Sequence, residues 1–181
     1  MTPALAFILG GARAGKSRFA QELAQKRAEA AGSSVCFIAT AEALDEDMRA
    51  RIRRHQAERP ASWRVIEEPR ALAAAYAQAA EAGVVLVDCL TLLVSNWLLS
   101  MPDDEANCLN AIETTLAAFL QTLARREQTV IVVSNEVGLG IVPDNALARR
   151  YRDLLGRVNQ SVAAAATEAY FVVAGIPWRV K

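Results

Sequence analysis

The sequence predicts an α/β fold in which a mostly parallel sheet is flanked by helices, within a single domain over residues 1–181. Three observations support this prediction: strands alternate with helices, the strands are apolar on both faces, and a glycine-rich turn follows the first strand. The predicted strands are short and nearly all apolar: 4–9, 35–39, 84–88, 129–134 and 169–174. Because such strands are buried on both faces, we expect right-handed βαβ crossovers and helices on both sides of the sheet.

Helix-like stretches separate these strands. They are rich in alanine, and they cover 16–31, 45–58, 69–82, 104–127 and 144–166. The long apolar region 83–99 is interrupted by Asp88 and Asn96, so it predicts a buried strand followed by a helix or loop rather than a membrane span. The segment MPDDEAN (101–107) is predicted to be a mobile surface loop. With no repeat or linker, one hydrophobic core is expected.

The composition excludes several classes of protein. Lys and Arg number 20, as do Asp and Glu, so no basic field indicates a nucleic-acid partner. The start of the chain has no basic segment before a short apolar stretch, unlike a secretory signal. The three cysteines do not form a disulfide framework, and we interpret them as small core residues in a reducing compartment. We therefore expect a cytoplasmic protein without a membrane span.

The turn after the first strand carries a phosphate-binding motif. Gly10, Gly15, Lys16 and Ser17 fit the pattern G-x-x-x-x-G-K-[ST], which a chain of this length matches by chance about one per cent of the time. Glycines let backbone N–H groups turn toward phosphate oxygens, and the following helix adds the positive end of its dipole. The alternative is a glycine-rich turn with an exposed lysine. The motif predicts a P-loop NTPase domain, in which Lys16 bridges the β- and γ-phosphates and Ser17 coordinates Mg²⁺.

A second metal ligand is expected at the end of a neighbouring strand. Asp88 ends the apolar run VVLVD, where a P-loop domain carries a carboxylate for Mg²⁺, although an aspartate that only caps the next segment is the alternative. The guanine-reading motif N-K-x-D of signalling GTPases is absent, since 134–137 reads SNEV. These patterns favour transfer of a phosphoryl or nucleotidyl group to a small molecule.

The only histidine, His55, is a candidate nucleophile. It lies in RIRRHQAERPASW (51–63) beside Arg53, Arg54 and Arg59. Nearby positive charge disfavours the imidazolium, which would keep the ring neutral as a nucleophile requires, while guanidinium groups bind phosphates. A solvated basic helix face is the alternative interpretation.

The segment NEVGLGIVP (135–143) is a candidate functional loop. It follows a buried strand at the carboxyl edge of the sheet, where open α/β folds bind ligands. Gly138 and Gly140 would let its backbone approach a ligand or a neighbouring subunit. The alternative is a flexible connection to the next helix.

Three segments together resemble the bifunctional adenosylcobinamide kinase/adenosylcobinamide-phosphate guanylyltransferase family of cobalamin biosynthesis. They are GGARAGKSRFAQ at the P-loop, FIATAEALDEDMRARIRRHQAERPASWRVIEEP (37–69) and SNEVGLGIVPDNALARRYRDLLGRVNQSVAAAATEAYFVVAGIP (134–177). The last two are far more specific than the P-loop, which many unrelated enzymes share. One departure is Ala14, where family members often carry serine; the glycines, Lys16 and Ser17 are unaffected.

The resemblance implies two reactions on one chain. In the first, the aminopropanol hydroxyl of adenosylcobinamide takes the γ-phosphoryl group of ATP or GTP. In the second, a histidine attacks the α-phosphorus of GTP and the GMP then passes to adenosylcobinamide phosphate. Since the chain has one histidine, His55 would carry this intermediate, with Lys16 as the other catalytic residue.

The resemblance also implies the nucleotide site, a RecA-like sheet and a homotrimer. The expected nucleotide-binding residues are Gly10, Gly11, Ala12, Arg13, Ala14, Gly15, Lys16, Ser17, Ala39, Thr40, Ala41, Gln56, Ala57, Glu58, Arg59, Glu67 and Asp88. Ser17 and Asp88 would hold Mg²⁺.

Three other classes of protein share part of this pattern. A plain P-loop kinase would leave His55 and 51–69 without a role, and a non-enzymatic nucleotide-binding module fits the strand pattern. A RecA-like DNA motor would need a basic stripe or stacking aromatics, whereas this chain is neutral and 6% aromatic.

Overall fold

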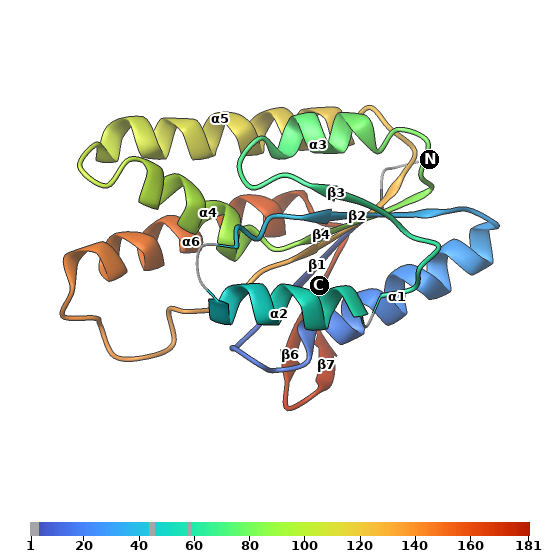
Figure 1. The fold of residues 1–181 in the computed structure, drawn as a ribbon, viewed down its shortest axis with the longest axis horizontal. Coiled ribbons are helices and arrows are strands. Elements are labelled where there is room, and N and C mark those ends of the chain that lie inside the picture. The colour runs from blue at the N-terminus through green and yellow to red at the C-terminus, as the bar shows by residue number, and fades with distance from the viewer. Residues whose placement is uncertain (1–3, 44–45, 58) are drawn as a thin grey trace.

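The computed structural model describes residues 4–43, 46–57 and 59–181, which form a seven-stranded sheet with helices on both faces (Figure 1). The strands are β1 (Ala4–Gly10), β2 (Val35–Ala39), β3 (Arg64–Glu67), β4 (Val84–Asp88), β5 (Thr129–Val133), β6 (Glu168–Val173) and β7 (Ile176–Arg179). The helices are α1 (Lys16–Ala31), α2 (Glu46–Ala57), α3 (Leu72–Gln78), α4 (Leu90–Ser100), α5 (Glu105–Leu123) and α6 (Ala146–Ala165).

The strand order is β3-β2-β4-β5-β1-β6-β7, and every pair is parallel except the terminal hairpin of β6 and β7. The five predicted strands are therefore confirmed as β1, β2, β4, β5 and β6 in a mostly parallel sheet. Because β1 lies between β5 and β6, with β4 beyond β5, the P-loop after β1 opens at the same sheet edge as the ends of β4 and β5. This order brings the predicted site residues to one edge.

The two faces of the sheet are covered differently. On one face α1 presents Ala20, Ala24 and Ala28, all buried, against the sheet. Their spacing of four places these small side chains on one side of the helix, so α1 packs closely. The helices α3, α4, α5 and α6 cover the other face over the larger apolar cluster, and α2 lies on the side of α1 (Figure 1). The layered arrangement predicted from the alternating pattern is thus confirmed.

Several predicted elements differ in extent. The helix predicted at 69–82 is limited to α3, and the segment after β4 is the helix α4. The predicted loop 101–107 is only partly a loop, because α5 begins at Glu105. Asp104 accepts a hydrogen bond from the backbone N–H of Asn107, a side-chain cap that begins the helix one residue after the predicted start at 104. None of the helices described is long and apolar enough to cross a membrane.

Candidate active site

The P-loop needs glycine at two positions for steric reasons. Gly10 has φ 153°, and a Cβ there would lie 2.4 Å from the carbonyl oxygen of Val172 on β6. Gly15 has φ 96° and is the N-cap of α1, where a Cβ would lie 3.2 Å from the Cα of Gly175. Any larger residue at Gly10 would force β1 and β6 apart. The motif glycines are therefore required by the packing of the loop against the strands beside it.

Backbone hydrogen bonds hold the P-loop on two sides. The N–H of Gly175, in the turn of the β6–β7 hairpin, donates to the carbonyl of Ala14 at 2.9 Å. The N–H of Glu136, just after β5, donates to the carbonyl of Gly10 at 3.1 Å. Lys16, the first residue of α1, is 8% exposed, and its Nζ donates to the carbonyl of Gly11 at 2.6 Å. The loop and the lysine are thus preorganised around one point, as a phosphate site requires.

A cavity of about 270 Å³ opens beside the P-loop at the carboxyl edge of the sheet. Its walls come from the start of α1, the ends of β2, β3 and β4, and one side of α2. The α2 residues Met48, Ile52 and Gln56 line it because their spacing of four places them on one side of the helix. The full lining is Ser17, Phe37, Ala39, Ala41, Ala43, Met48, Ile52, Gln56, Arg59, Glu67, Asp88, Cys89 and Leu92.

Seven of the residues predicted to bind nucleotide line this cavity together: Ser17, Ala39, Ala41, Gln56, Arg59, Glu67 and Asp88. The sheet register explains why. Ala39 on β2 pairs with Glu67 on β3 and with Asp88 on β4, so the two acids flank it in one row. Since neighbouring strands lie about 4.8 Å apart, the Cα atoms of these acids are roughly 10 Å apart. Two carboxylates therefore border one cavity from opposite sides.

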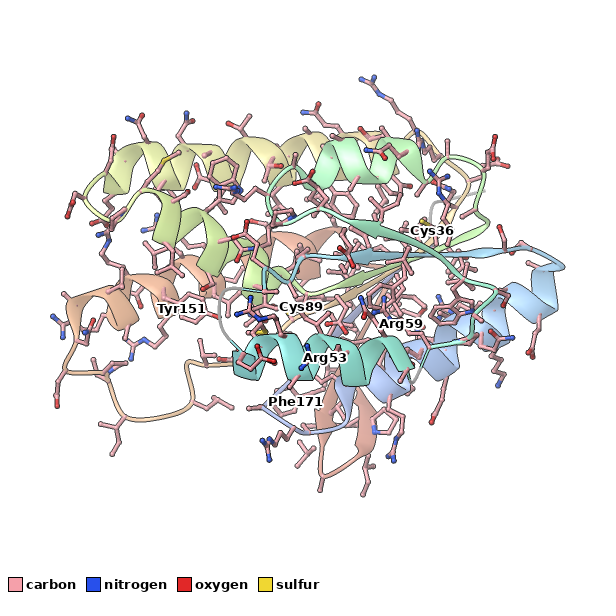
Figure 2. All side chains as sticks on the ribbon, in the orientation of Figure 1. Cys36, Arg53, Arg59, Cys89, Tyr151 and Phe171 are labelled. Atoms are coloured by element: carbon pink, nitrogen blue, oxygen red, sulfur yellow. The ribbon has the colours of Figure 1, made fainter. Side chains whose placement is uncertain are left out.

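Arg59 supplies positive charge between these carboxylates. Its guanidinium carbon lies 4.2 Å from the ring centroid of Phe37, a cation–π arrangement. Burial lowers the pKa of Arg59, and the charges of Asp88 and Glu67 oppose that shift, so the group stays protonated at any physiological pH. Figure 2 shows Arg59 and Cys89 between α2 and the sheet. The cavity thus combines an apolar floor with a fixed cation and two acids.

Thr40 lies behind the cavity wall rather than in it. Its fully buried hydroxyl donates to the carbonyl of Cys89 at 2.7 Å and accepts from the N–H of Cys89 at 2.9 Å. The side-chain amide of Asn96 on α4 donates to the carbonyls of Thr40 and Pro69, at 2.8 and 3.0 Å. These bonds tie together the segments that follow β2, β3 and β4. Thr40 therefore fixes the chain beside Asp88, although the prediction placed it among the lining residues.

Other predicted residues are placed as follows. Gly11, Ala12 and Arg13 are exposed on the P-loop, and Ala57 is exposed at the end of α2. Glu58 and the side chains of Arg54 and His55 lie outside the described residues. The backbone of His55 is in α2, three residues after Ile52, so helical spacing places this position beside the cavity-lining stripe. A nucleophilic His55 stays a prediction.

The basic cluster predicted around His55 divides into two environments. Arg53 is exposed and donates to Glu46 at 2.9 Å, while Arg59 faces the cavity. Hydrogen bonds from Arg53 and then Arg49 lower the pKa of Glu46. Arg53 is thus engaged in a surface ion pair on α2.

Comparison with known proteins decides the family. Residues 6–180 match the family described as cobinamide kinase / cobinamide phosphate guanyltransferase. The chain belongs to this family. A bifunctional adenosylcobalamin biosynthesis protein, CobP, of Pseudomonas aeruginosa is 46% identical over 175 residues, covering 96% of this chain and 95% of that protein. The bifunctional adenosylcobalamin biosynthesis protein CobU of Salmonella typhimurium is 41% identical over 182 residues, covering 96% and 98%.

Solved structures agree on the fold. The flagellar accessory protein FlaH of Methanocaldococcus jannaschii superposes with a TM-score of 0.55 at 15% identity, covering 99% of this chain and 79% of that one. A KaiC-like protein of Pyrococcus horikoshii gives 0.52 at 15% identity, covering 94% and 71%. This cobinamide kinase/guanyltransferase family member therefore shares with both structures the fold of a mostly parallel sheet flanked by helices.

The apolar part of the cavity was not predicted from the sequence. Phe37, Met48, Ile52 and Leu92 come from three different elements, and only the spacing of 48, 52 and 56 on one helix could have indicated part of it. In this family member they give the cavity an apolar surface beside Asp88 and Glu67.

The functional role of the loop 135–143 stays a prediction, and the structure describes the conformation of its glycines. Neither Gly138 nor Gly140 has a positive φ, and nothing lies within 4 Å of a Cβ built at Gly140. The conformational freedom of glycine is therefore not needed at these positions in this conformation. What the loop presents instead are exposed apolar side chains.

Proposed function

We propose that the chain phosphorylates adenosylcobinamide with ATP or GTP and then transfers GMP from GTP to adenosylcobinamide phosphate, giving adenosylcobinamide-GDP. The observation that carries this proposal is the meeting of the P-loop, Asp88 and the cavity side of α2 at one sheet edge. A triphosphate held at the P-loop would lie beside the helix that carries His55. The family's two activities can therefore share one nucleotide site.

In the kinase step, the P-loop holds the triphosphate through its backbone N–H groups and the ammonium of Lys16. The hydroxyl oxygen of adenosylcobinamide bonds to the γ-phosphorus, the bond from that phosphorus to the bridging oxygen breaks, and the hydroxyl proton is released. Charge accumulates on the phosphoryl oxygens during this transfer, so preorganised donors lower the barrier more than they strengthen ground-state binding.

Ser17 and Asp88 are the residues that would hold Mg²⁺. Both line the cavity next to the P-loop, and hydroxyl and carboxylate oxygens suit this hard cation, which also keeps water and phosphate ligands. Among the residues described, no group of three or more His, Cys, Asp or Glu could form a metal cage. When bound, the ion would neutralise phosphate charge. The chain's own part is to hold the Asp88 segment in place through Thr40.

In the guanylyl step, an unprotonated imidazole nitrogen of His55 attacks the α-phosphorus of GTP and pyrophosphate leaves. A phosphate oxygen of adenosylcobinamide phosphate then attacks the same phosphorus, and the phosphorus–nitrogen bond breaks. Arg59 faces this cavity and would offset negative charge on the nucleotide, while Gln56 and Glu67, joined at 3.3 Å, would orient it. We also propose that the protein forms a homotrimer and works in the cytoplasm.

Isotope labelling of the wild-type protein tests the proposal. With α-³²P-GTP and no corrinoid, we expect label that survives denaturation, is labile in acid and stable in base, as for a phosphoramidate on histidine. Addition of adenosylcobinamide phosphate should move this label to adenosylcobinamide-GDP. With γ-³²P-GTP, the label should appear in adenosylcobinamide phosphate and never on the protein. Product formation without a labelled protein would contradict the covalent step, and a plain kinase would show only the γ-label transfer.

A further inference from the structure

We propose that the apolar loop Val137–Val142, between β5 and α6, is the surface on which the corrin ring of the cobinamide substrate docks. This inference rests on the proposed function and extends it, because it names the place where the large substrate contacts the protein. The nucleotide cavity and the P-loop account for one substrate only.

The loop exposes large apolar side chains in an uncharged segment. Leu139 is 82% exposed, Ile141 97% and Val142 55%, and no charged residue occurs from Val137 to Pro143. Exposed apolar residues that stand singly are common, but several adjacent ones on a loop mark a binding surface. A corrin has broad apolar faces, so side chains of this kind are suitable contacts for it.

Both ends of the loop are fixed to the protein. At its start, the N–H of Glu136 donates to the carbonyl of Gly10 at 3.1 Å, and the carboxylate of Glu136 accepts from the N–H of Gly138 at 2.6 Å. At its end, Arg149 on α6 donates to the carbonyls of Pro143 and Asp144, at 2.8 and 2.6 Å. The apolar tip is therefore presented between two anchored ends.

The loop lies within reach of the reacting phosphate. Leu139 is three residues after Glu136, whose N–H is bonded to Gly10, so its Cα is within roughly 15 Å of the P-loop glycine. The acceptor hydroxyl must meet the γ-phosphate at Lys16. The ring to which it is linked cannot enter the cavity, because about 270 Å³ is below the roughly 300–1,000 Å³ that small drug-sized ligands occupy. The ring must therefore rest on the surface around the P-loop.

A second exposed apolar surface borders the P-loop, on the β6–β7 hairpin. Ile176 and Trp178 are 70% and 68% exposed there. However, β7 is the last strand of the sheet, and an edge strand offers backbone N–H and C=O groups that favour another strand as partner. The loop 137–142 contains no strand, so its apolar side chains are what it offers. The hairpin serves as the matched control surface.

The test compares two double variants, Leu139→Ser/Ile141→Ser in the loop and Ile176→Ser/Trp178→Ser in the hairpin. For the loop variant we expect the KM for adenosylcobinamide to rise at least tenfold, with an unchanged KM for the nucleotide. Binding of adenosylcobinamide alone, followed by its visible absorbance in equilibrium dialysis, should weaken equally. Self-labelling with α-³²P-GTP, which needs no corrinoid, should be unaffected. The apolar replacement Leu139→Met/Ile141→Leu should retain wild-type KM.

Each other outcome is decisive. An unchanged KM and unchanged corrinoid binding in the loop variant overturn the inference. If the loop variant keeps its corrinoid binding but loses its oligomeric state by light scattering, the loop contacts a second copy and the inference is wrong. A larger loss of corrinoid binding in the hairpin variant assigns docking to the hairpin instead. If the wild-type protein performs neither transfer but binds adenosylcobinamide, and the loop variant binds it at least tenfold more weakly, the proposed function fails while the docking surface stands.

Discussion

The P-loop and the α2 side of the cavity, called here its two walls, are built in different ways. The P-loop wall is enclosed: Gly10 has no room for a Cβ, backbone bonds join the loop to β6–β7 and to the end of β5, and Lys16 is buried. The α2 wall rests on the cavity through Met48 and Ile52, both half-buried, and its other described side chains are exposed. The difference indicates that the P-loop is preorganised, while the helix that carries His55 has a lower local stability.

Because the two walls differ, we expect substitutions in them to have different effects on the two proposed reactions. A bound triphosphate begins both proposed reactions, so a change in the P-loop should affect both. A change on α2 should affect only the reaction that uses its side chain.

The substitution His55→Asn should separate the two reactions. Asparagine reproduces part of the hydrogen bonding of imidazole but cannot form a phosphoramidate, whereas phosphoryl transfer to a hydroxyl needs no covalent relay. We expect guanylyl transfer to fall by about three orders of magnitude or more, and the kinase rate to stay within a few-fold of wild type. Both rates are measured by chromatography of the corrinoid products, and protein labelling by α-³²P-GTP should be lost.

The matched control for this variant is Arg53→Ala on the same helix. Arg53 is exposed and bonded to Glu46, so both transfer rates should remain near wild type. A His55→Asn protein that still forms adenosylcobinamide-GDP at a near wild-type rate would rule out the covalent route. In that case the cavity cation Arg59 would support direct transfer from GTP.

The substitution Lys16→Ala should weaken both reactions together. Its ammonium lies across the P-loop at 2.6 Å from the carbonyl of Gly11, where both triphosphates would be held. We expect nucleotide affinity to drop and both rates to fall at least tenfold, while circular dichroism shows the fold retained. Rates within a factor of two of wild type would contradict the P-loop interpretation. A loss confined to one reaction would contradict the shared site.

The substitution Thr40→Val should have a smaller effect that depends on Mg²⁺. Valine keeps the size of threonine but leaves the N–H and the carbonyl of Cys89 without their hydroxyl partner, so the chain beside Asp88 loses its anchor. We expect the Mg²⁺ concentration for half-maximal nucleotide binding to rise several-fold, and Thr40→Ser to restore it. Equal Mg²⁺ dependence in all three proteins would show that Thr40 has no positioning role.

The P-loop wall could be predicted from the sequence and the α2 wall only in part. The motif Gly10–Ser17 specifies its own geometry, since its glycines, lysine and helix start are local in the chain. Asp88 and Glu67 lie at the ends of two strands that are brought near each other by the order of strands in the sheet. No local sequence pattern indicates that order. The apolar part of the cavity depends on which side of α2 packs toward the sheet. Because α2 is only weakly amphipathic, its sequence does not indicate that side.

The two strands missed by the sequence interpretation lie at opposite edges of the sheet. Both β3 and β7 are short and mostly exposed, and β7 contains Pro177. A search for continuous apolar runs finds strands that are covered on both faces, and edge strands lack that signature. Asp104 lies where the predicted loop 101–107 and the predicted helix 104–127 overlap, and its side chain caps the start of α5.

The smallest predicted effect concerns how two ion pairs, one between α1 and β6 and one on α2, contribute to the free energy of unfolding at different pH. Glu168 at the start of β6 pairs with Arg27 on α1 and accepts from the hydroxyl of Tyr170 at 2.7 Å. Burial raises the pKa of Glu168, but these hydrogen bonds outweigh it and leave the pKa below its ordinary value. Because the folded pKa is lowered, the ionised pair stabilises the protein above the ordinary pKa of about 4.3, and this contribution is lost as the pH falls through the folded pKa.

We therefore expect Glu168→Gln to be less stable than wild type at pH 6 in urea unfolding, with a difference that shrinks from about pH 5 to pH 3. The control is Glu46→Gln on α2, whose fully exposed carboxylate also has a lowered pKa through Arg53 and Arg49. Solvent screens that pair, so its difference from wild type should be smaller at every pH. A difference at Glu168 that does not change with pH would show that the ion pair does not stabilise the contact between α1 and β6. An effect at Glu46 as large as at Glu168 would show that the exposed pair on α2 stabilises the protein as much as the pair between α1 and β6.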